Sequence, residues 1–514
     1  MNQLNISTDE VSKPKLLIFI VAYHAASTIA SVLSRIPFSL VHSYHIEVLI
    51  IDDASKDQTF EIGLKIASDG KLPFKVHVLF NPVNQGYGGN QKLGYHYAIE
   101  NDFDFVALIH GDGQYAPECL GELLEPLANG RADAVFGSRM LSRGQALKGG
   151  MPLYKFVGNK ILTAYENYIL KSSLSEFHSG YRLYSVNALK RIPFDLNTND
   201  FHFDTEIIVQ LIFANLKIAE LPIPTYYGDE ICRVNGIKYA WDVVKAVTKA
   251  KAQTMGFFYS PNFDCNSHTN SHYELKLGYR SPHSEILKHI TPGSRVLDLG
   301  CAGGYIGALL KEKLDCKVTG VDYFDLAPGI ALDEFIQYDL NKGVPDIDLS
   351  RFDYIVMLDV IEHLNSPESF MESLHKRLDQ NPNALVIASS GNIGFFIPRL
   401  MLLMGQFNYG KRGILDLTHT RLFTFSSFRR LFTQHGFEIQ FLDGIPGPFP
   451  LALGNNMISK ALVFINSLGI KISKGFFSYQ IFMVSKILPS LAYLLSHSME
   501  QSKIRSLKSH HDKQ

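Results

Sequence analysis

The sequence predicts two α/β domains in series, each built on a largely parallel β-sheet. The chain has 514 residues, more than one hydrophobic core usually organises. Short β-rich runs alternate with amphipathic helical patterns, and this alternation occurs twice along the chain. The stretch Phe257–Tyr273 is rich in Asn, Ser and His and separates the two series. It therefore marks the domain boundary.

The predicted strands are short apolar runs that end in polar or glycine-containing turns. In the first half they are Leu16–Ala22, Ile46–Ile51, Lys75–Phe80 and Phe105–Ile109, with crossover helices over Ser27–Ser34 and Thr59–Ala67. In the second half they are Arg295–Leu299, Lys317–Val321, Tyr354–Leu358 and Ala384–Ala388. We expect a first domain over 13–250, a linker over 251–275, a second domain over 276–488 and a C-terminal tail over 489–514.

Composition excludes some partners and locations. A net charge of -1 gives no electrostatic reason to expect nucleic acid as a partner. The polar N-terminus lacks the apolar centre of a signal peptide, and no apolar run reaches the length of a membrane-spanning helix. We expect a cytoplasmic protein that at most touches a membrane peripherally. The apolar segment Ile487–Ser496, with the basic tail beyond it, could make that contact, although packing on the core explains it better.

The cysteines are few, odd in number and widely spaced, which is typical of reduced thiols. They are Cys119, Cys232, Cys265, Cys301 and Cys316. Cys265, His268 and His272 could form part of a zinc site, but no fourth ligand is evident. A solvated linker is the better explanation of that stretch.

Polar clusters follow the second and third predicted strands. Ligands of open α/β sheets bind at the carboxyl ends of strands. Asp52 and Asp53 stand at such an end, where carboxylates can accept hydrogen bonds from a nucleoside. Asn84 and Gly86 belong to a glycine-rich turn that lets backbone approach a ligand closely. Taken alone, the run after Asp53 is better explained as a helix cap, and the turn as an ordinary glycine turn.

A third cluster follows the fourth predicted strand and contains His110 and Asp112. A carboxylate with a second ligand two residues away can hold a divalent cation. Such a cation would bridge the phosphates of a donor and stabilise a leaving diphosphate. Three strand-end clusters in sequence order favour a nucleotide site over unrelated turns.

On these motifs the segment from Lys15 to Val247 resembles the family 2 glycosyltransferases, closest to the dolichol-phosphate mannosyltransferase and polyprenyl-phosphate sugar transferase group. The matching motifs are Ile50–Ser55, Phe136–Arg139, Ser179–Arg182 and Phe203–Glu206. The resemblance implies a GT-A-type nucleotide-diphospho-sugar transferase fold and an inverting transfer from a nucleotide sugar to a glycan or polyprenyl phosphate. It also implies a cofactor of Mg²⁺ or Mn²⁺.

The same resemblance assigns roles to residues. It places Tyr23, Asp52, Asp53, Asn84, Gly86, Arg139 and Arg182 at the donor nucleotide, and Asp112 and His110 at the metal. Asp204 would be the base for a hydroxyl acceptor or would position the acceptor. A phosphate acceptor needs no base, and the two arginines could then bind it, although an ion pair explains either arginine equally well.

Two departures from the family pattern stand out. Val21–Ala25 lacks the glutamate of the family's Pro-x-Tyr-Asn-Glu opening, and His110 replaces the first aspartate of the metal motif. Imidazole ligates Mn²⁺, whereas Mg²⁺ prefers oxygen. These departures motivate an alternative in which the first domain binds a sugar nucleotide without catalysis.

The second half contains a strand, a glycine-rich turn and a helix start over Arg295–Gly307, with Asp322 ending the next strand. An acid at this spacing can bind ribose hydroxyls. The turn is Asp-x-Gly-x-x-Gly-Gly rather than the dinucleotide Gly-x-Gly-x-x-Gly. A later strand ends in the segment Met357–Leu364, which contains Asp359, Glu362 and His363.

The segment from Ser281 to Leu488 therefore resembles the Rossmann-like S-adenosylmethionine-dependent methyltransferases. Further matching segments are Leu417–Thr424, His435–Phe437 and a late strand over Phe477–Val484. One departure is Ala302, where the family usually has glycine.

The resemblance implies that Asp298, Gly300 and Gly304 shape the cofactor turn. It also implies that Asp322 binds the ribose, that Asp339 lies near the adenine and that Asp359 lies near the methionine part. His363 or His419 could accept a proton from an oxygen acceptor, with His419 the better candidate.

The preferred function is therefore bifunctional, because one domain would add a sugar and the other would methylate a sugar hydroxyl. Covalent fusion would raise the local concentration of a shared intermediate. Two alternatives stay open: a polyprenyl-phosphate sugar transferase fused to an unrelated methyltransferase, and a methyltransferase that carries the non-catalytic sugar-nucleotide-binding domain.

Overall fold

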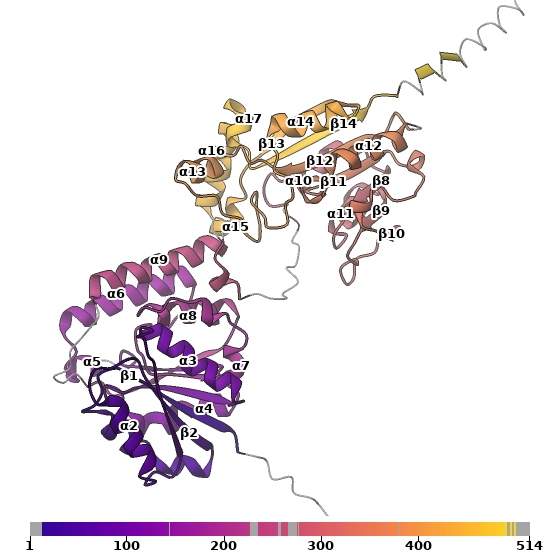
Figure 1. The fold of residues 1–514 in the computed structure, drawn as a ribbon. Helices are drawn as coiled ribbons and strands as arrows, with labels where there is room; N and C mark the ends of the chain where they lie inside the picture. The colour runs from indigo at the N-terminus through magenta and orange to yellow at the C-terminus, as the bar shows by residue number, and fades with distance from the viewer. Residues whose placement is uncertain are drawn as a thin grey trace, which may run out of the picture. The chain divides into compact units, whose positions relative to one another are not determined.

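The structure is a computed structural model and describes residues 13–142, 144–226, 235–254, 259–265, 275, 277–379, 381–490, 494–495 and 498–499. The chain divides into two compact units. One comprises Met1–Thr254 and Ser260–Thr269, and the other comprises Met255–Tyr259 and Asn270–Gln514. Figure 1 shows both as ribbons, the first in indigo to magenta and the second in rose to yellow.

The first unit alternates strands and helices from its first element. In chain order they are β1 (Lys15–Ala22), α1 (Ile29–Ser34), β2 (His45–Asp52), α2 (Thr59–Ser68), β3 (Lys75–Phe80), α3 (Tyr87–Glu100), β4 (Phe105–His110), α4 (Leu120–Ala128), β5 (Ala134–Ser138), α5 (Gln145–Lys148), α6 (Leu153–Leu170), β6 (Arg182–Ser185), α7 (Val186–Leu189), α8 (Phe203–Phe213), β7 (Ile218–Pro222) and α9 (Gly236–Thr254).

These strands form one seven-stranded sheet in the order β3-β2-β1-β4-β6-β5-β7. The pairings of β1, β2, β3 and β4 are parallel, as the sequence predicts, whereas β6 runs antiparallel to both of its neighbours. The predicted strand Lys75–Phe80 has the observed bounds but is only partly buried, because β3 lies at the edge of the sheet. Chain order reverses between β1 and β4, and such switch points are where open α/β sheets bind ligands.

Apolar side chains cover both faces of this sheet. Alternate residues of β1 face opposite sides, so Phe19 belongs to one core and Ile18 to the other. Helix α3 packs closely on β1 at Gly94, where an added Cβ would come within 2.1 Å of the ring of Phe19. Glycine at this position lets the helix that follows the glycine-rich turn lie directly on the central strand.

The second unit repeats the plan. Its elements are α10 (Pro282–His289), β8 (Arg295–Leu299), α11 (Tyr305–Leu314), β9 (Lys317–Asp322), β10 (Glu334–Gln337), β11 (Tyr354–Leu358), α12 (Pro367–Leu378), β12 (Leu385–Gly391), α13 (Phe396–Leu403), α14 (Phe425–Gln434), β13 (Phe437–Ile445), α15 (Phe449–Leu453), α16 (Met457–Ile472), α17 (Lys474–Phe477) and β14 (Gln480–Ile487).

The second sheet also has seven strands, in the order β10-β9-β8-β11-β12-β14-β13, and β14 is antiparallel to both of its neighbours. The predicted strands Arg295–Leu299 and Tyr354–Leu358 have the observed bounds. The last strand begins at Gln480 rather than Phe477, because the residues before it form α17. Chain order reverses here between β8 and β11, which places a second switch point beside the glycine-rich turn.

The segment predicted as a solvated linker is partly buried. Phe263 and Cys265 are 3% and 8% exposed and join the core of the first unit. Cys119, Cys265, Cys301 and Cys316 are free thiols. Cys232, His268, His272 and most of the predicted tail lie outside the described residues. Within the part of the chain that the structure describes, no helix is both long and apolar enough to cross a bilayer.

Candidate active sites

The first candidate site lies where β1, β2 and β4 end. In the parallel register Ala22 lies beside Asp52, and Val21 lies beside His110. The amide of Gly111 donates to the carbonyl of Val21 at 2.9 Å, which ties the turn after β4 to the end of β1. The fold therefore brings two of the three predicted polar clusters to strand ends on either side of β1, and the third follows β3, the other neighbour of β2.

Asp52 is fully buried at this edge. Its Oδ1 accepts hydrogen bonds from the backbone amide and the hydroxyl of Ser55, while its Oδ2 has no partner among the described residues. Tyr23, which is 43% exposed, packs its ring edge-on against His24, and the His24 amide donates to Ser55. An orphaned carboxylate oxygen beside an exposed aromatic ring fits a nucleoside that offers N–H or O–H donors.

Asp53 organises the glycine-rich turn that follows β3. Its carboxylate accepts from the side-chain amide of Asn81 and from the backbone amides of Gln85 and Gly86, at 2.8 to 3.0 Å. Asn84 donates to the Asp53 carbonyl and accepts from the Gly86 amide. Gly86 has φ of 80°, and a Cβ there would lie 2.7 Å from a backbone oxygen. These residues shape the turn, and their direct contact with a nucleotide stays a prediction.

His110 lies at the centre of the site. Its Nε2 shares a hydrogen bond with the Tyr87 hydroxyl at 3.2 Å. Burial lowers the pKa of His110 against the opposing effect of Asp112 and Asp204, which keeps the imidazole neutral. A neutral imidazole can ligate a metal through Nδ1 while Nε2 stays with Tyr87. Asp112 is exposed on the same turn and accepts from the Gln114 amide at 3.0 Å.

Asp204 lies in the first turn of α8 and is 6% exposed. It accepts hydrogen bonds from the Tyr87 hydroxyl at 2.9 Å and from the Gln91 amide at 3.2 Å. The guanidinium of Arg182 lies 3.6 Å from the carboxylate. Three partners therefore hold Asp204, and Tyr87 connects it to His110.

The two arginines predicted at the donor are both held by protein groups. Arg182 is 1% exposed and donates to the carbonyls of Phe177 and Ser179. Burial disfavours the charged guanidinium of Arg182, whereas the nearby carboxylate of Asp204 favours it. The net effect raises the pKa of Arg182. Arg139 is paired with the buried carboxylate of Glu176. Arg182 therefore lies against Asp204, and its Nη1 is buried without a hydrogen-bond partner among the described residues. Direct contact of either arginine with a donor stays a prediction.

One group of three potential metal ligands occurs among the described residues, and it is not the predicted pair. It consists of Asp200, His202 and Asp242. Lys238 lies 3.2 Å from each of the two carboxylates and already offsets part of their charge. This cluster is an ion-pair network.

The second candidate site begins at the turn after β8. Gly300 and Gly304 have φ of 78° and 81°, in the left-handed region that favours glycine. A Cβ at Gly300 would lie 2.5 Å from Val360, so the turn passes directly beside the end of β11. Asp298 is buried beneath it with Oδ2 unpartnered among the described residues. Burial and Asp322 raise the pKa of Asp298 to about 7. The unpartnered carboxylate oxygen of Asp298, below a turn with two glycines of positive φ, fits a cofactor that has a cationic amino-acid part.

Asp322 ends β9 and clamps the same turn. Its carboxylate accepts from the backbone amides of Ala302 at 2.7 Å and Phe324 at 2.9 Å. Ala302 has φ of 47°, which explains why glycine is usual at this position: the turn is left-handed here too. Asp322 retains acceptor capacity for ribose hydroxyls, because a carboxylate has about four lone-pair directions.

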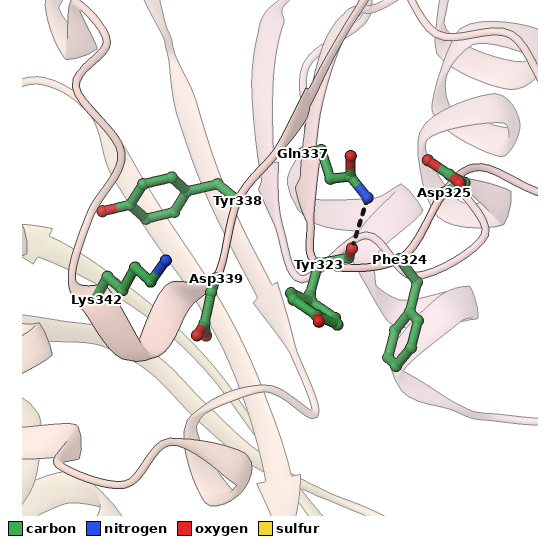
Figure 2. A pocket seen from close by; sticks show the side chains of 7 residues that line it. All are labelled: Tyr323, Phe324, Asp325, Gln337, Tyr338, Asp339 and Lys342. Atoms are coloured by element: carbon green, nitrogen blue, oxygen red, sulfur yellow. Dashed lines mark hydrogen bonds between the residues drawn. The ribbon is translucent and has the colours of Figure 1, made fainter.

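A hollow of about 440 Å³ opens beside Asp322. Its lining residues are Tyr323, Phe324, Asp325, Gln337, Tyr338, Asp339 and Lys342. Figure 2 shows the side chains of Tyr323, Phe324 and Asp339 projecting to the same side of the hollow. Tyr323 and Phe324 are 63% and 70% exposed. Exposed aromatic faces next to a carboxylate suit a purine nucleoside.

Asp359 faces the same edge of the sheet from the end of β11. Its two oxygens accept from the Ser389 hydroxyl and the Gln480 amide, each at 2.7 Å. Its φ of 54° is unusual for a residue with a side chain. Glu362 is 2% exposed, and burial together with Asp359 raises its pKa to about 8. One of the two acids is therefore protonated near neutral pH.

The two histidines predicted as alternative bases lie together. The rings of His363 and His419 are 4.7 Å apart, edge to face. His419 Nδ1 lies 2.9 Å from the carbonyl of Ile414, and His363 Nδ1 lies 3.1 Å from the hydroxyl of Thr418. Burial lowers the pKa of His419. A carbonyl partner fixes hydrogen on Nδ1 of a neutral ring, which leaves Nε2 of His419 as a proton acceptor.

Sequence reasoning missed several residues that the structure brings to these sites. Tyr87 and Gln91 of α3 both donate hydrogen bonds to Asp204. They are four residues apart, a spacing that places two side chains on the same side of a helix and that could have indicated a shared partner. Tyr323 and Phe324 directly follow Asp322, the acid predicted to bind ribose, which was a stronger signal for a nucleoside pocket. Nothing in the sequence pointed to Gln480 as a partner of Asp359.

Comparison with protein families finds a different family in each half of the chain. Residues 17–193 match the model described as glycosyl transferase family 2. Residues 272–441 match the model described as a methyltransferase domain. Each match falls on one half of the chain and includes that half's strand-end residues.

Individual relatives match the first half. A low-salt glycan biosynthesis hexosyltransferase of Haloferax volcanii is 30% identical over 45% of this chain and 52% of its own length. The UDP-N-acetylglucosamine–dolichyl-phosphate N-acetylglucosaminyltransferase of Methanococcus voltae is 29% identical over 42% of this chain and 87% of its own. A solved glucosyl-3-phosphoglycerate synthase of Mycobacterium tuberculosis, with Mn²⁺ and UDP, is 17% identical over 46% of this chain and 78% of its own, with a TM-score of 0.35. The chain thus spans about half the length of the hexosyltransferase.

Proposed function

Because the chain carries a family 2 glycosyl transferase domain followed by a methyltransferase domain, we propose that it is a bifunctional enzyme of lipid-linked glycan synthesis. Its first unit would transfer a sugar from a nucleotide sugar to a polyprenyl phosphate. Its second unit would methylate a sugar hydroxyl with S-adenosylmethionine. The dolichyl-phosphate acceptor in the name of the Methanococcus voltae relative supports the lipid phosphate.

The observation that carries the choice of acceptor is the state of Asp204. A hydroxyl acceptor needs a base with a free lone pair directed at its proton. The carboxylate of Asp204 is instead almost fully buried, and each of its oxygens already accepts one hydrogen bond, from Tyr87 or Gln91, beside the guanidinium of Arg182. A phosphate acceptor is already an anion and needs no base. The arrangement therefore favours a polyprenyl phosphate over a glycan hydroxyl.

The donor would bind along the switch point of the first sheet. Asp52 offers an unpartnered oxygen and Tyr23 an exposed ring to the nucleoside. Neutral His110 and exposed Asp112 fit a divalent cation, which would neutralise the charge of the leaving diphosphate. The histidine favours Mn²⁺ over Mg²⁺ as that cation.

In the second unit the left-handed turn at Gly300 and Gly304 would admit the cofactor, with Asp322 at its ribose and the hollow of Figure 2 at its adenine. The sulfonium of the bound cofactor supplies the methyl group as an electrophile. The chain itself has to orient the acceptor oxygen and remove its proton. His419, neutral because of burial, would accept that proton.

The test is a turnover screen of the full chain. A panel of nucleotide sugars with Mn²⁺ or Mg²⁺ is offered with short-chain polyprenyl phosphate, and released nucleoside diphosphate is measured. Asp112→Ala should lower release by about 100-fold, whereas Asp69→Ala, which removes an exposed acid at the end of α2, should leave it unchanged. Release that ignores Asp112 would contradict the proposed metal site.

The second activity is read separately. Label from the methyl group of S-adenosylmethionine should appear in the glycolipid formed by the first reaction, and in no product when the lipid phosphate is omitted. Methylation that is independent of the lipid product would show that the two domains serve different substrates.

A specific observation favours one second candidate. His110 replaces a carboxylate in the metal motif and is neutral and hydrogen-bonded to Tyr87, so Asp112 is the motif's one anionic ligand. A first unit with a weakened cation site could bind a sugar nucleotide without turnover. Tight binding with no release of nucleoside diphosphate, across metals and acceptors, would establish this candidate and exclude the transferase.

A further inference from the structure

Helix α16 of the second unit is turned with its apolar side outward. The residues that it buries are Ser459, Asn466, Gly469 and Ile470, of which only Ile470 is large and apolar. Five of its exposed residues are large and apolar and follow a helical spacing. They are Met457, Ile458, Phe464, Ile465 and Ile472, which are 81%, 68%, 64%, 61% and 84% exposed. A helix that packs only on its own domain has the opposite arrangement.

Specific contacts fix this orientation. The side chain of Asn466 accepts from the Gly447 amide at 2.8 Å and donates to the Phe477 carbonyl at 2.9 Å. A Cβ at Gly469 would lie 2.7 Å from the ring of Phe477, so no larger residue fits there. Ser459 is buried and closes the capping box at the start of the helix. Rotating the apolar side inward would break these hydrogen bonds and would place larger side chains where Gly469 lies against Phe477.

Helix α13, which is near α16 in the fold, also exposes large apolar side chains. Leu400, Leu402, Leu403 and the Met404 that follows are 50%, 52%, 82% and 66% exposed. The ring of Phe396 lies 6.1 Å from that of Phe476 in α17, which in turn contacts α16. Figure 1 shows α13, α16 and α17 grouped at one end of the second sheet. We call the outward residues of α13 and α16 the apolar face.

The segments that carry the apolar face hold cations and no carboxylate, although Lys474 is paired with Asp443 of β13 at 3.0 Å. The segments 380–415 and 444–499 contain no aspartate or glutamate. Together they carry Arg399, Lys411, Arg412, Lys460, Lys471, Lys474 and Lys486. Lys460 and Lys471 belong to α16 itself and are exposed. Apolar side chains flanked by cations are complementary to the headgroup region of an anionic bilayer.

The apolar face lies at the cofactor edge of its unit. Helix α13 follows the carboxyl end of β12, and helices α15 to α17 connect β13 to β14 at that same edge. The first residue of β14, Gln480, donates to Asp359. A surface that rests on a membrane here would bring the methyl-transfer edge close to the headgroups.

We propose that the apolar face docks the second unit on an anionic membrane surface, with the outward residues of α16 inserted among the headgroups. The docking does not depend on the proposed function. Where that function holds, docking would place the methyltransferase edge at the level of a lipid-linked sugar.

Flotation of the full chain with vesicles tests this proposal. Vesicles of phosphatidylcholine with and without phosphatidylglycerol are compared at low and high salt. The wild-type chain should float with the anionic vesicles, more weakly at high salt. Ile458→Glu combined with Ile465→Glu should reduce binding by about 10-fold or more. Leu64→Glu combined with Val83→Glu places the same charges on exposed apolar residues of the first unit and should change it by less than about 2-fold.

Folding of each variant is followed by circular dichroism and thermal unfolding, so that a loss of binding is not confused with unfolding. A second pair, Lys460→Glu with Lys471→Glu, leaves the apolar side chains in place and should lower binding to anionic vesicles alone. Equal flotation of the α16 variants and the wild-type chain would overturn the proposal and indicate another surface. A wild-type chain that does not float, and whose dimer the α16 variant converts to monomer in light scattering, would assign the apolar face to a second copy.

Discussion

The imidazole of His110 lies directly on the backbone of Gly180. A Cβ added at position 180 would come within 2.5 Å of both Cε1 and Nε2 of the ring. The hydroxyl of Tyr87 holds the same ring from another side, at 3.2 Å from Nε2. The position of the metal-motif histidine therefore depends on the absence of a side chain 70 residues further along the chain.

Gly180→Ala should lower sugar transfer without unfolding the first unit, because the new methyl group displaces His110 from Tyr87. We expect a loss of about 10-fold or more in released nucleoside diphosphate, since misplacing one group at the reacting centre costs about that much. Gly158→Ala is the matched control: an added Cβ there meets nothing within 4 Å, and alanine favours the helix. Equal activity of the two variants would show that the His110 position is unimportant.

Asp204 and Arg182 form a buried ion pair, so replacing only one of the two residues should destabilise the first unit. Asp204→Ala leaves the guanidinium of Arg182, 1% exposed, without its carboxylate and should cost about 3–5 kcal/mol of stability. Arg182→Met added to Asp204→Ala should recover much of this loss. Urea unfolding followed at Trp241, the one tryptophan of the chain, reports the first unit. A double variant less stable than Asp204→Ala alone would contradict the pairing.

Gly300→Ala should weaken binding of S-adenosylmethionine by about 10-fold or more, because the new Cβ meets Val360 and the left-handed backbone disfavours alanine. Isothermal titration measures the change. Val360→Ala added to Gly300→Ala should restore part of the affinity by removing the contact but not the backbone strain. Gly278→Ala, with open space around the new methyl group, serves as control. Unchanged affinity in Gly300→Ala would remove this turn from the cofactor site.

The stability of the second unit should fall as pH rises through the neutral range. Burial raises the pKa of Glu362 to about 8 in the folded state, so the folded chain holds this proton more tightly than the unfolded chain. The stabilisation is complete below the unfolded pKa and is lost as pH approaches the folded value, with a slope of at most about 1.4 kcal/mol per pH unit. Asp298, with a pKa of about 7, contributes in the same direction.

Glu362→Gln isolates this contribution, because glutamine keeps the shape and cannot titrate. Denaturant unfolding of both proteins between about pH 5 and about pH 9 should show a shallower decline for the variant. Parallel pH profiles would mean that Glu362 is ionised throughout.

Methyl transfer should depend on neutral His419. Its pKa is lowered by burial, so activity should persist to a more acidic pH than an exposed histidine would allow and then fall as the ring is protonated. His419→Gln should lower turnover and abolish that acidic limb, with the affinity for S-adenosylmethionine unchanged. His363→Gln, which alters the ring beside it, should shift the limb without removing it. If the fall in activity at acidic pH persists in His419→Gln, a group other than His419 accepts the proton during methyl transfer.

Local pattern predicted much of the fold. The runs Lys75–Phe80, Arg295–Leu299 and Tyr354–Leu358 are strands with the predicted bounds, because a buried strand is a short apolar run with turn residues at its ends. The antiparallel strand β6 was not predicted, since strand direction is decided by pairing between distant segments. The outward face of α16 also escaped prediction. Its apolar spacing matches that of a core helix, and the orientation depends on Asn466 and Gly469.

The sequence by itself determined where strands occur along the chain, where the two glycine-rich turns lie and which acids stand at the strand ends. Backbone conformation and hydrophobic period are local properties, so a sequence pattern is enough to predict them. Only the tertiary structure decided what each charged group faces. Arg182 lies 3.6 Å from Asp204, and Arg139 is paired with Glu176. A charge removed from water must be paired with an opposite charge, and the fold alone determines which opposite charge lies within reach.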